Sequence, residues 1–113
     1  MPAAYQNLII EAGSNFSATI TIDDVYQELY DLNGYTGASQ MRKSYYSANS
    51  TADFLVTINP ETGTVTLELD PPTTANIAPG RYVYDAILID AAHNYTVRIL
   101  EGTIDVSPRV TRI

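Results

Sequence analysis

Hydrophobic and polar residues alternate with a period of two along much of the chain, a pattern typical of half-buried β-strands. The clearest alternation covers residues 16–22, 54–59 and 64–69. The last two runs flank a short polar turn that ends at Gly63, and this arrangement predicts a β-hairpin. A shorter apolar run at residues 8–11 predicts one more strand.

The longest β-type stretch covers residues 76–90 and enters its strand through Pro79-Gly80. Proline presets one turn dihedral, and glycine accepts the positive φ that other residues resist. Beyond this turn both parities are mostly apolar, which is typical of a central strand covered at least in part on both faces. We therefore expect the other strands to pair with it or pack over it.

Residues 95–107 predict a long return strand whose apolar positions change parity part-way along. Val97 and Ile99 share one parity, whereas Ile104 and Val106 share the other. A period-two pattern changes face only where a residue is inserted, so we predict a β-bulge near Glu101-Gly102.

Three other segments are less regular. Residues 35–46 predict a strand in which Gly37 marks a bulge or a close approach of another chain segment. The apolar spacing of residues 25–32 fits either two helical turns or a hairpin-like return, and we favour the return. Residues 73–77 predict a single α-helical or 3₁₀ turn that places Ile77 under the sandwich.

Together these elements predict an all-β domain of about seven to eight short strands, an immunoglobulin-like antiparallel β-sandwich. In such folds a tyrosine near the start of the penultimate strand hydrogen-bonds back to the preceding corner. Tyr82 is placed for this role, and Pro79 and Gly80 form the corner. The sandwich is expected over residues 8–107.

The ends of the chain lack any period. We interpret residues 1–7 as an N-terminal arm and residues 108–113 as a C-terminal tail, each ordered only where it docks on a neighbour. We expect both to be removable without loss of the fold.

The amino-acid composition excludes several kinds of site and ligand. The 113 residues are enough for one core, and the absence of cysteine excludes disulfides and thiolate sites. The net charge of −7 argues against nucleic acid as a ligand, because phosphates would be repelled. No apolar run is long enough to span a membrane, and no leader pattern precedes the domain, so we expect synthesis in a cytoplasm.

Residues suited to catalysis or metal binding are few. His93 is the only histidine and lies in a hairpin tip, a poor position for a preorganised base. A zinc site would need further nitrogen or sulfur ligands, which the sequence lacks. Calcium could use Asp23-Asp24 with Asp31, or Asp85 with Asp90, but solvated turns are the simpler interpretation. We predict no catalytic residues, no cofactor and no metal.

One cluster suggests an interface. Arg42, Lys43, Tyr45 and Tyr46 concentrate cations and tyrosines in an otherwise acidic chain, and arginine and tyrosine are enriched at protein–protein hot spots. The alternative is a strand end at which Tyr45 or Tyr46 belongs to the core and the cations pair with Asp or Glu. The sequence leaves both interpretations open.

Three segments carry a family resemblance: residues 31–43 (DLNGYTGASQMRK), 79–85 (PGRYVYD) and 101–104 (EGTI). They are similar to segments of a small β-sandwich found in structural proteins of tailed bacteriophages. This sandwich occurs in cyanophage-type virion proteins and in the N-terminal domains of baseplate upper proteins. The resemblance implies a non-enzymatic structural component of a virion, as a capsid decoration or a neck, tail or baseplate accessory protein. It implies contacts with other virion proteins, homo-oligomers within the particle, and no catalytic residues.

A second hypothesis is a carbohydrate- or receptor-binding module of a phage tail or fibre. It would use Tyr45, Tyr46 and a neighbouring acidic residue on one face of the sandwich.

Overall fold

The computed structural model describes residues 4–21 and 34–110. They form nine strands and two short helices: β1 (Ala4–Tyr5), β2 (Leu8–Glu11), β3 (Phe16–Thr21), β4 (Thr36–Arg42), β5 (Ala52–Asp53), β6 (Leu55–Asn59), β7 (Thr64–Leu69), α1 (Pro71–Ala75), β8 (Gly80–Asp90), η2 (Ala91–His93) and β9 (Tyr95–Ser107). Neither helix in this part of the chain is long and apolar enough to cross a membrane.

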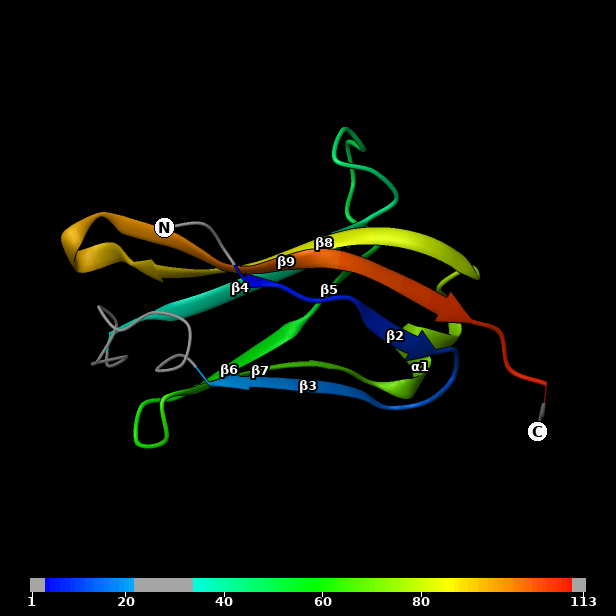
Figure 1. Cartoon of the computed structure of the whole chain (residues 1–113), viewed down its shortest axis with the longest axis horizontal. Helices are drawn as coiled ribbons and strands as arrows, with labels where there is room; N and C mark the ends of the chain where they lie inside the picture. The colour runs from blue at the N-terminus through cyan, green and yellow to red at the C-terminus, as the bar shows by residue number, and fades with distance from the viewer. Residues whose placement is uncertain (1–3, 22–33, 111–113) are drawn as a thin grey trace.

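The strands form two sheets that pack face to face (Figure 1). The first sheet has the order β1-β9-β8-β4-β5, with β2 also paired to β9, and the second has the order β3-β7-β6. Consecutive strands β3 and β4 lie in different sheets, as in a Greek key. The predicted immunoglobulin-like sandwich is confirmed, except that β1 and β2 run parallel to β9.

The core lies between the two sheets. From the first sheet, alternate residues of β8 are buried, namely Tyr82, Tyr84, Ala86 and Leu88. They meet buried residues of β7 in the second sheet, where Val65 and Leu67 are each 1% exposed. The residues of opposite parity on β8 are only partly covered, so β8 turns one face toward the core. β8 lies in the middle of the first sheet, which confirms the central strand predicted from the sequence.

The corner before β8 matches the prediction. The Tyr82 hydroxyl donates a hydrogen bond of 2.6 Å to the Ala78 carbonyl oxygen. Gly80 has a φ of +146°, which L side chains rarely adopt, and Ile77 is buried with 4% exposure. The confirmed corner sets where β8 begins.

The helical turn before this corner begins earlier than expected. It covers Pro71–Ala75, because prolines fit the first helical positions, whose N–H groups have no partner within the helix in any case. The Asp70 side chain caps this helix by accepting a hydrogen bond of 3.1 Å from the Thr73 N–H.

The bulge predicted in β9 exists at a different position. Ala86 pairs with Leu100 and Ile87 pairs with Arg98, so Ile99 is the additional residue. Ile99 and Leu100 are both buried, and this is where the parity of the core positions changes. The prediction at Glu101-Gly102 was about two residues too late, because the sequence offered glycine as the signal and the bulge uses an isoleucine.

Gly102 has another role, at the edge where the N-terminal strands meet β9. The Gln6 carbonyl oxygen occupies the position that a Cβ atom at Gly102 would need. Gln6 also accepts a hydrogen bond of 2.6 Å from the Tyr84 hydroxyl, and Asn7 Oδ1 accepts one of 2.9 Å from the Thr103 hydroxyl. Residues 4–7 of the predicted arm therefore lie hydrogen-bonded along the sheet edge.

Two other expectations concern β4 and the segment before it. The predicted close approach at Gly37 is confirmed, since the Val56 side chain of β6 lies against its Cα. The strand expected at residues 35–46 is shorter, ending at Arg42, because the chain turns away from the ladder there. The return predicted at residues 25–32 and the candidate ligands Asp23, Asp24 and Asp31 lie outside the described residues.

Candidate functional site

The loop between β4 and β5, residues 43–51, projects from the first sheet and carries most of the predicted interface residues (Figure 1). Hydrogen bonds inside the loop fix its shape. The Arg42 guanidinium donates a hydrogen bond of 3.1 Å to the Ser47 carbonyl oxygen. The Thr51 N–H donates one of 2.7 Å to the Met41 carbonyl oxygen. The Ser44 N–H also donates 3.1 Å to the Ser47 hydroxyl.

The two tyrosines of this loop face solvent. Tyr45 is 69% exposed and Tyr46 is 97% exposed. The interpretation of these residues as core is therefore wrong. Large aromatic side chains on a hydrogen-bonded loop lose little conformational freedom when a partner covers them, which makes them effective binding anchors.

The two cations of the predicted cluster lie in different places, since Arg42 ends β4 and Lys43 begins the loop. Lys43 Nζ lies 4.8 Å from the centre of the Tyr82 ring, beside the corner. Arg42 lies on the outer face and also donates 2.8 Å to Gln40 Oε1. The structure thus brings Arg42 and Tyr45 together and places Lys43 apart from them.

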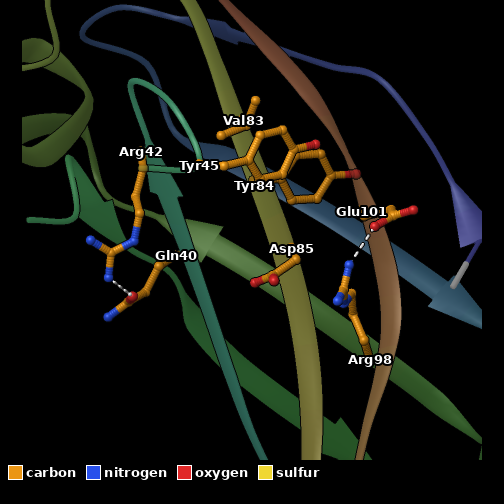
Figure 2. A pocket seen from close by; sticks show the side chains of 8 residues that line it. All are labelled: Gln40, Arg42, Tyr45, Val83, Tyr84, Asp85, Arg98 and Glu101. Carbon is orange, nitrogen blue, oxygen red and sulfur yellow. Dashed lines mark hydrogen bonds and ion pairs between the residues drawn. The ribbon is translucent and has the colours of Figure 1, made fainter. Parts of the chain in front are cut away.

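A cavity of about 220 Å³ opens on the outer face of the first sheet, beside the loop (Figure 2). It lies over β4, β8 and β9, and Tyr45 stands at one side. The residues around it are Gln40, Arg42, Tyr45, Val83, Tyr84, Asp85, Arg98 and Glu101.

Pairing across the sheet places these side chains together. Gln40 of β4 is opposite Asp85 of β8, and Asp85 is opposite Glu101 of β9. The Ser39 hydroxyl donates a hydrogen bond of 2.6 Å to the Asp85 carbonyl oxygen, which ties β4 to β8 at this level. Three strands therefore contribute polar side chains to one row.

The charges of the cavity are arranged around Asp85. On one side Arg42 bonds Gln40, and on the other Arg98 Nη1 lies 2.7 Å from Glu101 Oε2 (Figure 2). The Asp85 carboxylate lies between these pairs and makes no hydrogen bond or ion pair with the described residues. It is the acceptor that a ligand in the cavity would reach.

The sequence did not predict that these residues line one cavity. Asp85 was considered only as a calcium ligand with Asp90, yet residues five apart on β8 point to opposite faces. A signal was present, since Asp85 is a charged residue in an otherwise apolar strand. Its neighbours on β4 and β9 could not be named before the strand register was known.

Other candidate groups stay separate from the cavity. His93 lies in η2, in the turn between β8 and β9 where the sequence placed it. Within residues 4–21 and 34–110, no three His, Cys, Asp or Glu side chains lie close enough to hold a metal ion. Burial raises the pKa of the Tyr84 phenol, so that its hydroxyl remains a donor to Gln6.

Comparisons with known proteins support the fold. No protein-family model matches the chain, and no curated protein matches it. Among 171 solved chains of similar structure is the crystal structure of InlP from Listeria monocytogenes, with a TM-score of 0.55 and 13% sequence identity. The match covers 93% of this chain and 28% of InlP, so the chain spans less than a third of that protein. At this identity the likeness shows the fold alone.

Proposed function

We propose that the protein is a non-enzymatic structural component of a tailed-phage virion that binds neighbouring virion subunits through its β4–β5 loop. The main contact residue is Tyr46, on a loop whose backbone is held by Arg42. The partners are other virion proteins of the capsid, neck, tail or baseplate, and copies of the chain form homo-oligomers in the particle. The protein is made in the host cytoplasm and works in the virion.

The observation that carries the binding role is the exposure of Tyr46, 97%, on a loop whose backbone is hydrogen-bonded. A large aromatic side chain left in water gains apolar contact area when a partner covers it. Because Arg42 and Thr51 already hold the loop, little ordering cost remains for binding. The resemblance of residues 31–43, 79–85 and 101–104 supports virion subunits as the partners.

The position of the loop supports the proposed contact. It extends from the first sheet, away from the second sheet and from the edge held by β1 and β2 (Figure 1). A partner can therefore contact the loop without opening a strand pair. Binding through such a projection leaves the sandwich as a rigid spacer between neighbouring subunits.

Replacement of one tyrosine tests this proposal. We expect Tyr46→Ala to reduce incorporation of the protein into phage particles at least about tenfold, the loss typical of an interface anchor. Quantitative mass spectrometry of purified particles measures the incorporated amount. Tyr95→Ala is the matched control, because Tyr95 is 46% exposed at the start of β9, outside the loop.

Both variants should keep the circular dichroism spectrum and urea midpoint of the wild type, since neither side chain belongs to the core. Equal incorporation of Tyr46→Ala and the wild type would contradict the proposed contact. Absence of the wild-type protein from purified particles would contradict the structural role itself.

A further inference from the structure

We propose that the cavity on the outer face of the first sheet binds one ring of a carbohydrate. Asp85 accepts hydrogen bonds from sugar hydroxyls, Arg42 and Arg98 donate to sugar oxygens, and the Tyr45 ring packs against the apolar face of the sugar. This is a ligand site separate from the assembly contact at Tyr46, which is not among the residues that line the cavity.

The charge of the cavity favours a neutral ligand. Arg42 and Arg98 balance Asp85 and Glu101, so the lining residues carry no net formal charge, whereas the whole chain carries −7. A second hollow, beside α1, is lined by Asp53, Glu68, Asp70 and uncharged residues, without a cation. The cavity at Asp85 therefore differs from that hollow in pairing its carboxylates with charged donors.

A sugar ring uses both kinds of group, because each hydroxyl donates one hydrogen bond and accepts others. The Asp85 carboxylate offers oxygen acceptors that no described residue occupies. Arg42 uses Nη1 and Nη2 for Ser47 and Gln40, and a guanidinium has five N–H donors in all, so donors remain for a ligand. Hydrogen bonds to these ionised groups are stronger than neutral ones.

The cavity also offers an apolar wall. Tyr45 stands beside it with 69% of its surface exposed, and Val83 lies in the same row of the sheet as Arg42. The C–H groups on one face of a pyranose are apolar and can cover an aromatic ring while the hydroxyls at its rim bond polar groups. Tyr45 thus provides the contact area, and Asp85 provides the orientation.

The size of the cavity sets the extent of the ligand. Its volume of about 220 Å³ is below the roughly 300–1,000 Å³ of sites for drug-sized ligands. One sugar ring is the unit that fits, and the rest of a glycan would extend into solvent from the open side. We therefore expect low millimolar affinity for a single sugar.

The test is a chemical-shift titration of the ¹⁵N-labelled protein with methyl glycosides of glucose, galactose, mannose, N-acetylglucosamine and rhamnose. We expect at least one of them to shift the backbone amides of Gln40, Asp85 and Arg98 in a saturable way. Asp85→Asn keeps the shape of the side chain and removes its charge, and Tyr45→Ala removes the ring. We expect each variant to weaken the best sugar roughly tenfold, as for the loss of one charge-assisted hydrogen bond or one stacked ring.

Tyr46→Ala is the matched control and should bind the sugar as the wild type does. Glycerol, a polyol without a ring, and methylguanidinium, a mimic of an arginine side chain, are the control ligands. The proposal is overturned if none of the five sugars shifts these amides, if glycerol acts equally well, or if methylguanidinium binds and the sugars do not.

The sugar site and the assembly contact can fail independently. Asp85→Asn should bind the sugar more weakly and still enter particles, whereas Tyr46→Ala should enter particles poorly and still bind the sugar. If Asp85→Asn binds the best sugar with wild-type affinity, the carboxylate does not hold the ligand and the site is wrong as described.

Discussion

At the scale of single residues, Gly102 joins three segments of the first sheet. Its Cα faces the Gln6 carbonyl oxygen, and the same oxygen accepts the hydrogen bond from the Tyr84 hydroxyl. Gly102 also has a φ of +159°, where L side chains are strained. At Gly102 the N-terminal segment therefore contacts Tyr84, a buried core residue of β8.

Gly102→Ala should therefore destabilise the fold by about 1–3 kcal/mol, because backbone must shift to admit a Cβ atom. Gly34→Ala is the matched control: Gly34 has a φ of +87° but no atom within 4 Å of its Cβ position. Urea unfolding followed by circular dichroism measures both. Equal losses for the two variants would show that contact with Gln6 contributes nothing.

Tyr84 predicts a dependence on alkaline pH. Its pKa is raised above the ordinary value of 10.0, chiefly because burial disfavours the charged phenolate. The Tyr84 phenol ionises near pH 10 in the unfolded chain and only at higher pH in the folded protein. The contribution of Tyr84 to stability is therefore complete below pH 10 and is lost as the pH rises further. The wild type should lose stability more steeply above pH 10 than Tyr84→Phe.

At neutral pH, Tyr84→Phe should cost about 1 kcal/mol through the lost hydrogen bond to Gln6. Unfolding midpoints measured from pH 8 to pH 11 provide both values. Tyr95→Phe, which removes a hydroxyl from a half-exposed site on β9, is the matched control. Parallel curves for the wild type and Tyr84→Phe would contradict the role of burial.

At the scale of elements, α1 depends on its N-cap. The Asp70 carboxylate accepts from Thr73, and this hydrogen bonding lowers the pKa of Asp70 below 3.8. A lowered pKa contributes stability that is present above the unfolded pKa and is lost as the pH falls through the folded pKa. Asp70→Asn should therefore flatten the decline of stability between about pH 5 and pH 2.

Thermal unfolding across this range measures the effect. Glu61→Gln, in the exposed loop between β6 and β7, removes one carboxylate without removing a cap and is the matched control. If both variants decline with pH as the wild type does, the cap does not stabilise the ionised form of Asp70.

Much of the element order could be predicted, because period-two alternation records which face of a strand is buried. The hairpin of β6 and β7, the central strand β8 and the corner at Tyr82 all follow from local pattern. The position of the β9 bulge does not, since Ile99 and Leu100 are both buried and only pairing with Ala86 and Ile87 shows which one is extra.

The candidate site was predictable only in part. Tyr45 and Tyr46 could be recognised by residue type, but whether they belonged to the core depended on where β4 ended. The cavity needed the register of three strands, which brings Gln40, Asp85 and Glu101 into one row from distant parts of the chain. No local pattern contains that register.

At the scale of the whole molecule, residues 4–7 of the expected arm belong to the sandwich. The Gln6 N–H donates 2.9 Å to the Glu101 carbonyl oxygen, and Gln6 and Asn7 accept from Tyr84 and Thr103. Deletion of residues 1–7 should therefore destabilise the fold by about 2–4 kcal/mol, from the loss of these three hydrogen bonds. The sequence had suggested that the fold would be unaffected.

Deletion of residues 1–3 alone keeps those three hydrogen bonds and serves as the control. Urea unfolding of both truncated forms beside the wild type gives the comparison. If deletion of residues 1–7 leaves the unfolding free energy at the wild-type value, residues 4–7 do not stabilise the fold and form a removable arm.

The proposed function also belongs to the whole molecule, because it concerns how copies of the sandwich meet their neighbours. The proposal predicts that tailed-phage particles contain the chain, and the most direct measurement is an electron-microscopy map of such particles. We expect density for the sandwich at regular positions, with Tyr46 covered by an adjacent virion subunit. Particles without the protein, or a sandwich whose β4–β5 loop faces solvent in every copy, would contradict it.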